Sequence, residues 1–333
     1  MTAKDHFAEI GILAYPGARL SAVEGLTDMF LVANHLAEGY QGLQRPVMRV
    51  THWKRGENGR IETYHDTCPQ MPAKPLIMIV PGCFDQPMDA ADCAPFAQWL
   101  LGWHRQGTVL SAVCGGSFLL AETGLLNGRT ATTHWMYIDM FAKRFPGIKT
   151  DRDRLIIDDG DIITAGGMMA WTDLGLRLIH RVLGPTLMLA TAQFMLVDPP
   201  GREQRYYSSF VPQLQHGDER ILKVQHWLQS NGARDVSLKA MAGKAGMEER
   251  TFLRRFQKAT GLKPTEYCQH VRVGNARQLL EFSNQSIEQV AWGSGYEDTG
   301  AFRKVFFKIV GLTPGEYRRR FRVGTQLPTA SAA

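Results

Sequence analysis

The C-terminal part of the chain repeats itself, because many residues recur at an offset of 50 positions. Phe252 and Phe256 recur as Phe302 and Phe306. The segment after each pair recurs too, with matches of Lys258 to Lys308, Gly261 and Leu262 to Gly311 and Leu312, Pro264 to Pro314, and Glu266 and Tyr267 to Glu316 and Tyr317. An internal repeat of this kind means that one structural unit is used twice. This part of the chain is therefore predicted to contain two copies of one small motif.

Each copy is predicted to be a helix, a tight turn and a second helix. In the first copy, Ser237 caps a helix over 238–244, Gly246 makes the turn, and a helix over 248–259 ends at Gly261. In the second copy, Ser286 caps a helix over 287–292, Gly295 makes the turn, and a helix over 298–310 ends at Gly311. Because the phenylalanines are four residues apart, one face of each second helix should be buried.

The opposite face of each second helix carries polar and basic side chains, as a recognition helix does when it enters the major groove of DNA. The predicted DNA contacts are Arg250, Thr251 and Arg254 in the first copy, and Thr299, Gly300, Arg303 and Lys304 in the second. A helix over 265–282 follows Pro264 and is roughly 27 Å long at ~1.5 Å per residue. Its length is comparable with one turn of B-DNA, ~34 Å. Both recognition helices are therefore expected on one side of the duplex, in successive major grooves.

Charge is distributed unevenly between the two ends of the chain. Residues 216–333 contain 19 Lys and Arg against 11 Asp and Glu, whereas residues 1–215 contain 19 against 21. A basic end is typical of a polyanion partner, here double-stranded DNA. The alternative is an all-helical oligomerisation bundle in which the repeated aromatic residues only form a core. The repeat, the turns and the charge together favour DNA binding.

The N-terminal part alternates short apolar runs with helical stretches over residues 8–197. The runs 75–80, 108–113 and 161–165 are mostly apolar or β-branched and precede helix-like segments. This pattern predicts a doubly wound, flavodoxin-like α/β domain with a parallel sheet, whose ligand site lies at the C-terminal ends of the strands. Residues 198–217 are predicted to link it to an all-α domain over 218–322, and residues 323–333 to form a disordered tail.

Cys114 follows one of these buried strands and precedes Gly115 and a helix, which is the layout of a nucleophile elbow. A thiol at a helix N-terminus is expected to favour the thiolate. His134 is a candidate base, and Gly82 and Cys83 are candidate backbone donors beside the thiol. These parts fit a cysteine hydrolase, although a lone cysteine or histidine is more often structural. Candidates for contact with a cationic ligand are Glu24, Asp28, Trp135 and Trp171.

Both parts resemble known families. Residues 246–267 and 295–317 resemble the paired helix-turn-helix signature of AraC-family transcription regulators, which implies base contacts in both copies; Gly300, however, offers no side chain. Tyr15-Pro16-Gly17, Val80-Pro81-Gly82, Ala112-Val113-Cys114-Gly115-Gly116 and Ala131-Thr132-Thr133-His134-Trp135 resemble the ThiJ/PfpI branch of the class I glutamine-amidotransferase-like superfamily. The fusion is similar to GlxA-type regulators. Enzymatic relatives carry an acidic residue where this chain has Ala22, so the resemblance implies a sensor with a vestigial Cys114 and His134.

The remaining expectations concern partners and location. The resemblance implies a small effector such as an amine, an amino acid or a betaine-like metabolite, a homodimer, and RNA polymerase as a partner if the protein is an activator. No metal or cofactor is expected, because the five cysteines lack the short paired spacings of zinc sites. The absence of a long apolar run or signal peptide predicts a cytoplasmic protein with no membrane partner. The alternative function is a cysteine-dependent hydrolase or amidotransferase-like enzyme with an accessory DNA-binding domain.

Overall fold

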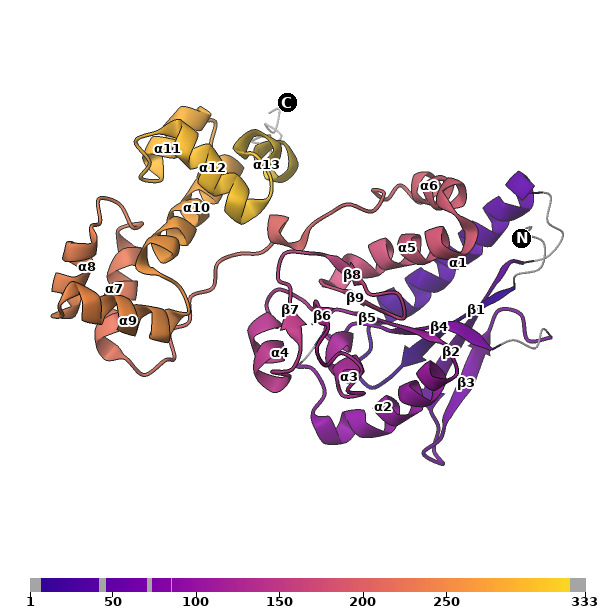
Figure 1. The fold of residues 1–333 in the computed structure, drawn as a ribbon. Coiled ribbons are helices and arrows are strands. Elements are labelled where there is room, and N and C mark those ends of the chain that lie inside the picture. The colour runs from indigo at the N-terminus through magenta and orange to yellow at the C-terminus, as the bar shows by residue number, and fades with distance from the viewer. Residues whose placement is uncertain (1–6, 42–45, 71–73, 85, 324–333) are drawn as a thin grey trace, which may run out of the picture. The chain divides into compact units, whose positions relative to one another are not determined.

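The computed structural model describes residues 7–41, 46–70, 74–84 and 86–323. The chain divides into two compact units, and the boundary lies between Gln204 and Arg205 (Figure 1). The boundary lies within the segment expected to link two domains. Of the expected disordered tail, only Val323 is among the described residues. No helix in the described ranges combines the length and apolar character needed to cross a membrane.

The first unit is built on a seven-stranded sheet with the order β3-β2-β1-β4-β5-β9-β8. The strands are β1 Ala8–Ala14, β2 Met48–Arg55, β3 Ile61–Asp66, β4 Pro75–Val80, β5 Val109–Val113, β8 Ile156–Asp158 and β9 Ile162–Ala165. The four inner pairings are parallel, as predicted, whereas both edge strands, β3 and β8, pair antiparallel with their neighbours. The sheet is therefore mixed and not wholly parallel, because short hairpin-like returns complete its two edges.

Helices cover both faces of this sheet, which explains why its central strands are apolar throughout. One face packs against α1 Leu20–Gln41, α5 Trp171–Leu183 and α6 Pro185–Phe194, and the other against α2 Ala90–Arg105, α3 Gly116–Ala121 and α4 Ile138–Arg144 (Figure 1). A short parallel pair, β6 Thr130–Ala131 and β7 Lys149–Thr150, and a 3-10 turn, η2 Met168–Ala170, complete the unit. The predicted doubly wound α/β class is confirmed.

The second unit is all-helical, as predicted, and follows a 3-10 turn, η3 Gln204–Tyr206. Its helices are α7 Glu219–Ser230, α8 Leu238–Ala245, α9 Glu249–Thr260, α10 Pro264–Phe282, α11 Ile287–Gly293, α12 Thr299–Val310 and α13 Pro314–Phe321. Ser237 and Ser286 cap α8 and α11 through their side chains. Gly246, Gly261 and Gly311 end their helices in the left-handed conformation that favours glycine. Asp298, expected as a helical residue, is instead the N-cap of α12.

The two copies of the sequence repeat pack their side chains in the same way. Phe252, Phe256, Phe302 and Phe306 are fully buried. The ring of Phe256 meets that of Tyr267 edge to face at 5.3 Å between centroids, and Phe306 meets Tyr317 in the same way at 5.5 Å. Glu266 and Glu316 each accept a hydrogen bond from the backbone at the start of their helix, α10 and α13. Each copy thus has its own aromatic core, and α10 contributes to both cores.

Residues 205–217, which we call the strap, pack along the second unit. Arg277 of α10 is buried and donates to the carbonyl oxygens of Ser208 and Arg205, the latter at 3.1 Å. Phe210 stacks on His270 with ring centroids 4.8 Å apart. His216 is hydrogen-bonded to Gln225 of α7 at 2.7 Å. The strap therefore contacts α7 and the shared helix α10.

Candidate functional site

The helices α9 and α12 present the predicted DNA contacts on the face opposite their buried phenylalanines. Arg250 and Arg254 are exposed on α9, and Thr251 is half-buried beside them. On α12, the exposed positions are Gly300, Arg303 and Lys304, whereas Thr299 is half-buried. Each copy thus offers at least two exposed cationic side chains on the second helix of a helix-turn-helix. This arrangement can place cations against base edges and phosphates in a major groove.

The N-terminus of α12 is capped by the side chain of Asp298, the residue before the helix. The Asp298 carboxylate accepts hydrogen bonds from the backbone nitrogens of Gly300 and Ala301, at 2.9 and 3.0 Å. A Cβ added at Gly300 would lie 3.3 Å from that carboxylate, so a small residue suits this position. Arg303 forms an exposed ion pair with Glu288 of α11, at 3.2 Å. Exposed pairs of this kind are weak, so Arg303 can exchange Glu288 for DNA at little cost.

The first recognition helix is fastened to α7 by a bidentate ion pair. Arg255 donates from two guanidinium nitrogens to Asp218, both at 2.9 Å, and Asp218 also caps α7. These hydrogen bonds from Arg255 lower the pKa of Asp218. Arg255 therefore positions α9 within the unit, whereas its neighbour Arg254 is left exposed.

Cys114 lies at a strained elbow between β5 and α3. Its φ of 53° is in the left-handed region, which a residue with a side chain rarely adopts. The glycines around it are needed for space: a Cβ at Gly82 would lie 3.0 Å from the Cys114 Cβ, and one at Gly115 would lie 2.3 Å from the Cys83 sulfur. The predicted elbow residues Gly82, Cys83, Cys114 and Gly115 are therefore brought together.

The chemistry of this thiol is not that of an activated nucleophile. Cys114 is 1% exposed, and burial raises its pKa to about 12, outweighing a backbone hydrogen bond at Gly115 that lowers it. The thiolate expected at a helix start is thus not favoured. His134 lies in the adjacent loop, where Thr133 donates to the Cys114 carbonyl at 2.7 Å. The His134 Nδ1 accepts from the backbone nitrogen of Met136, and in the described ranges no hydrogen bond joins it to Cys114.

The other predicted ligand contacts are dispersed. Glu24 and Asp28 are exposed on α1, and the described residues show neither carboxylate hydrogen-bonded to the elbow. Burial raises the pKa of Tyr64 in β3, and the nearby negative charge of Glu24 raises it further. Trp135 is half-buried beside His134, with ring centroids 5.4 Å apart. Trp171, the remaining predicted contact, packs against Gly25 in a hydrophobic core cluster that also contains Cys114.

Gln204, the last residue of the first unit, has a role that sequence reasoning missed. It is 2% exposed, accepts a hydrogen bond from the Trp135 backbone at 2.7 Å, and donates to the Thr133 and Arg152 carbonyls at 3.1 and 3.3 Å. Gly166 leaves room for it, because a Cβ there would lie 2.5 Å from the Gln204 amide nitrogen. The loop beside the elbow is thus hydrogen-bonded to the residue that precedes the DNA-binding unit.

Comparisons with known proteins agree with both halves of this description. A family model described as a helix-turn-helix domain matches residues 241–320. A second model, of the DJ-1/PfpI family, matches residues 46–181. The first match contains α9 and α12, and the second contains the elbow at Cys114. The predicted resemblances are confirmed.

Curated relatives match more than two thirds of the chain. The HTH-type transcriptional regulator GlxA of Rhizobium meliloti is 29% identical over 238 residues, which cover 71% of this chain and 72% of that protein. The HTH-type transcriptional regulator CdhR of Pseudomonas aeruginosa is 28% identical over 244 residues, covering 73% and 71%. Among solved structures, a ThiJ/PfpI family protein from Pseudomonas syringae matches with a TM-score of 0.45 and 20% identity, over 73% of this chain and 93% of that one. The family matches and the two regulators identify this chain as a DNA-binding transcription regulator in which a DJ-1/PfpI domain precedes an AraC-type helix-turn-helix domain.

Proposed function

We propose that this regulator senses a small metabolite in its DJ-1/PfpI domain without converting it, and that binding changes its affinity for DNA. The observation that carries the proposal is the position of Gln204, which joins the loop of Thr133, His134 and Trp135 to the start of the DNA-binding unit. A ligand that moves this loop must move or break those hydrogen bonds. The elbow residues Cys114, Gly82, Cys83 and Gly115, with His134 and Trp135, form the proposed site, and Glu24 and Asp28 are its proposed outer contacts.

A sensor agrees better than an enzyme with the chemistry of the elbow. A thiol whose pKa is about 12 is almost wholly protonated at neutral pH, and it has no base hydrogen-bonded to it in the described part of the chain. The effector class inferred from the resemblance is a small amine, an amino acid or a betaine-like compound. The cationic group of such a compound would bind the face of the Trp135 ring and the carboxylates of α1.

For the DNA, we propose contacts through Arg250, Thr251 and Arg254 of α9, and Thr299, Arg303 and Lys304 of α12. Gly300 allows close approach of the backbone. The protein would act in the cytoplasm as a homodimer on a repeated operator, and with RNA polymerase if it activates transcription. Two recognition helices in each chain would then engage four segments of major groove.

The experiment is a fluorescence-anisotropy titration of the full chain with duplexes from its own promoter region and with a scrambled duplex. Titrations are repeated with a panel of amines, amino acids and betaines. We expect specific binding that at least one compound changes several-fold, and that Cys114→Ala or Trp135→Ala alters the response to that compound. Failure to prefer the promoter in dilute salt would overturn the DNA contacts, whereas specific binding that no compound changes would overturn the sensor.

A second candidate function rests on the strained conformation of Cys114, because such elbows expose nucleophiles in hydrolases. In that case the chain would be a cysteine-dependent hydrolase or amidotransferase-like enzyme that also binds DNA. Turnover assays on amides, glyoxals and isonitriles separate the two candidates. The enzyme hypothesis requires a catalytic activity that Cys114→Ser abolishes, whereas the sensor hypothesis requires no catalytic activity.

A further inference from the structure

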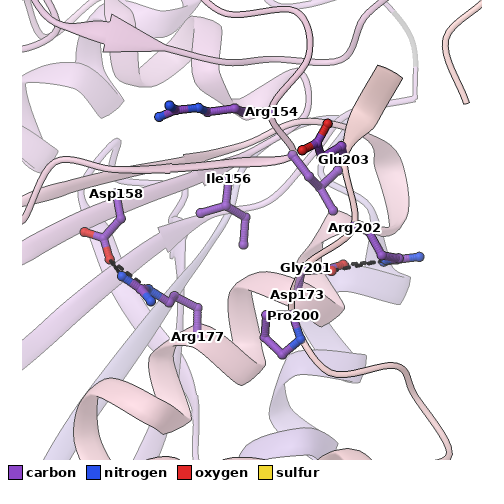
Figure 2. Close-up of a pocket in the computed structure, with 10 residues that line it drawn as sticks. Arg154, Ile156, Asp158, Asp173, Arg177, Pro200, Gly201, Arg202 and Glu203 are labelled. Atoms are coloured by element: carbon purple, nitrogen blue, oxygen red, sulfur yellow. Dashed lines mark hydrogen bonds and ion pairs between the residues drawn. The ribbon is translucent and has the colours of Figure 1, made fainter. Parts of the chain in front are cut away.

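A pocket of about 430 Å³ lies at one edge of the sheet in the first unit, and its lining includes none of the elbow residues. Its walls come from the edge strand β8, from α5, and from residues 200–203 of the segment that leads to Gln204 (Figure 2). The volume is within the range of small-molecule sites, roughly 300–1,000 Å³. This pocket is therefore large enough for a compact metabolite.

The charged side chains of this pocket balance each other. Three cations and three anions line it: Arg154, Arg177, Arg202, Asp158, Asp173 and Glu203. Arg177 donates to Asp158 at 2.9 Å, and Arg202 donates to Asp173 from two nitrogens. Figure 2 shows these two ion pairs on opposite sides of Ile156. A lining with both signs of charge and an apolar centre matches a ligand that is itself dipolar and has no net charge.

Asp173 is what distinguishes this pocket from an ordinary charged surface. Its side chain is only 2% exposed, although it carries a carboxylate, so the site includes a buried charge held by Arg202. Burying a carboxylate costs free energy that a surface ion pair avoids. The pair therefore fixes residues 200–203 against α5 and gives the pocket a defined wall.

Arg154 and Glu203 line the pocket from two segments that are distant in sequence. The backbones of these two residues pair in an isolated antiparallel bridge, which fixes them side by side at the rim. The Arg154 side chain is 71% exposed, and its ion pair with Asp151 is long, at 3.6 Å. A guanidinium held this loosely can turn to grip a ligand carboxylate through two parallel hydrogen bonds.

We propose that this pocket is a second small-molecule site, separate from the elbow, and that it takes a zwitterion of amino-acid size. The ligand carboxylate binds Arg154, and its cationic nitrogen binds Glu203. Because residues 200–203 form one wall and Arg205 begins the DNA-binding unit, occupancy of the site restrains the segment between the units. That regulatory consequence rests on the proposed function, whereas binding itself does not.

The test measures binding to the full chain by calorimetry and thermal shift. The probes are glycine, L-alanine, L-valine, L-glutamine, L-arginine and glycine betaine at millimolar concentration, each amino acid being matched by its methyl ester and its N-acetyl derivative. We expect at least one zwitterion to bind with one equivalent per chain that the Cys114→Ala variant retains. Its ester and N-acetyl derivative should bind at least tenfold more weakly, because each lacks one of the two charges. If no zwitterion binds, or if the derivatives bind equally well, the site is overturned.

Variants locate the ligand. Arg154→Gln and Glu203→Gln should each weaken binding at least tenfold without lowering the melting temperature of the free protein by more than a few degrees. The matched control is Arg181→Gln, on the same helix as Arg177 but outside this lining, where the side chain donates to the Gly160 carbonyl. Cys114→Ala should leave binding unchanged; loss of binding in that variant would place the ligand at the elbow and overturn a second site.

The regulatory consequence has its own measurement. Promoter affinity of the full chain is measured with and without the bound zwitterion, in the wild type and in Arg154→Gln. A several-fold change that disappears in the variant supports the coupling. Binding with no change in promoter affinity overturns the coupling. If promoter binding itself is absent, the failure belongs to the proposed function.

Discussion

At the scale of single residues, Cys114 has the backbone geometry of a nucleophile but not the reactivity of one. Its positive φ and the glycines around it are those of a nucleophile elbow, yet its thiol is buried and its pKa is raised to about 12. Burial disfavours the charged form of a thiol more than one backbone hydrogen bond favours it. The elbow therefore positions a neutral thiol beside the Thr133 loop.

This predicts how the thiol behaves towards an alkylating reagent. At pH 8 a thiol with a pKa about 12 is ionised in roughly one molecule in 10⁴, so iodoacetamide should modify Cys114 far more slowly than the half-buried Cys68. Peptide mass spectrometry over a time course measures both rates, and Cys68→Ala removes the competing site as a control. Modification of Cys114 before Cys68 in the folded protein would contradict the assignment.

The DNA-binding residues allow an equally local prediction. Arg254→Ala should weaken binding to the promoter by ~1–3 kcal/mol, the usual loss for a good contact with a base. The matched control is Lys258→Ala in the last turn of α9, which is also exposed and should affect mainly the salt dependence. Titrations of specific and scrambled duplexes at two salt concentrations measure both effects. Equal weakening on the two duplexes would show that Arg254 contacts only phosphates.

Residue identities alone predicted caps and turns better than pocket contacts. Ser237, Gly246, Gly261 and Gly311 act locally, so their roles follow from their neighbours in sequence. The roles of Gln204 and Trp171 depend on residues that are distant in sequence. Polar residues and prolines around Gln204 predict a linker, and the sequence does not indicate that Gly25 makes room for Trp171 in the core.

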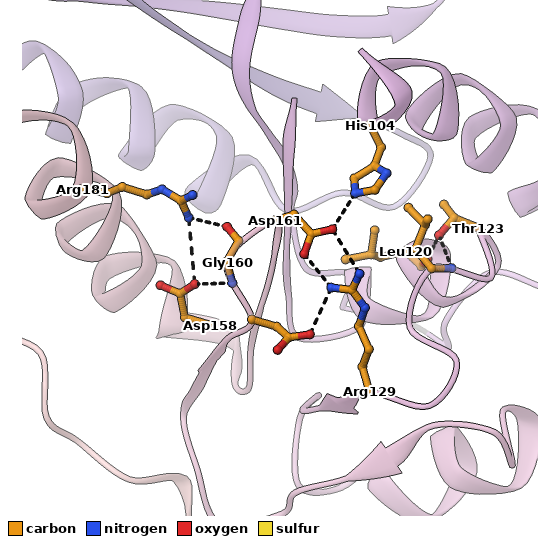
Figure 3. Close-up of polar contacts among 10 residues, drawn as sticks. His104, Leu120, Thr123, Arg129, Asp158, Gly160, Asp161 and Arg181 are labelled. Atoms are coloured by element: carbon orange, nitrogen blue, oxygen red, sulfur yellow. Dashed lines mark hydrogen bonds and ion pairs between the residues drawn. The ribbon is translucent and has the colours of Figure 1, made fainter. Parts of the chain in front are cut away.

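At the scale of elements, polar clusters hold loops and helices to the sheet. Figure 3 shows Arg129 and His104 converging on Asp161, which precedes β9. Arg129 donates at 2.6 and 3.2 Å, and the distance from the His104 Nε2 to Asp161 is 2.8 Å. The cluster joins the last turn of α2 and the residue before β6 to the turn between β8 and β9. No periodicity in the sequence indicates such a cluster, because its members lie 57 and 32 residues apart.

The cluster predicts that the folded protein loses stability as the pH becomes acidic. Hydrogen bonds from Arg129 lower the pKa of Asp161 to about 2, below the ordinary value of ~3.9 expected in the unfolded chain. Its contribution is therefore fully present above about pH 4 and is lost as the pH falls towards 2. Asp161→Asn should lower the urea midpoint at pH 7 and reduce the further loss on going to pH 3. Asp139→Asn, at an exposed ion pair with Arg152, serves as the control. An unchanged pH dependence in Asp161→Asn would contradict the assignment.

The strap, which the sequence predicts as part of a linker, packs on the second unit. Residues 205–217 have no helical or strand periodicity, yet Arg277, Phe210 and His216 pack them onto the second unit. Burial lowers the pKa of Arg277, whose guanidinium donates hydrogen bonds to two strap carbonyls. The chain therefore fixes its two helix-turn-helix copies by a shared helix, α10, and by an extended segment.

At the scale of the whole molecule, the first unit ends at a buried residue, Gln204, and the second unit begins at the next residue. Gln204 uses its side-chain oxygen and nitrogen in the first unit, and the strap begins at the next residue. Coupling between sites requires a physical element whose state both sites affect. The doubly wound fold, the two helix-turn-helix copies and the elbow were predictable from local patterns. The role of Gln204 was not, because it depends on one amide that is hydrogen-bonded to two loops distant in sequence.

The connection leads to a prediction about signal transfer. Gln204→Ala removes the hydrogen bonds to the loop of Thr133 and Trp135, so the metabolite that changes promoter affinity in the wild type should lose most of that effect. Gly166→Ala, whose Cβ would displace the same amide, should act alike, whereas the exposed Gln193→Ala should respond normally. Typical coupling of 1–3 kcal/mol would make the wild-type response roughly 5- to 150-fold. Anisotropy titrations measure the response, and calorimetry shows whether the metabolite still binds. A full response in Gln204→Ala with unchanged metabolite affinity would mean that the signal takes another route.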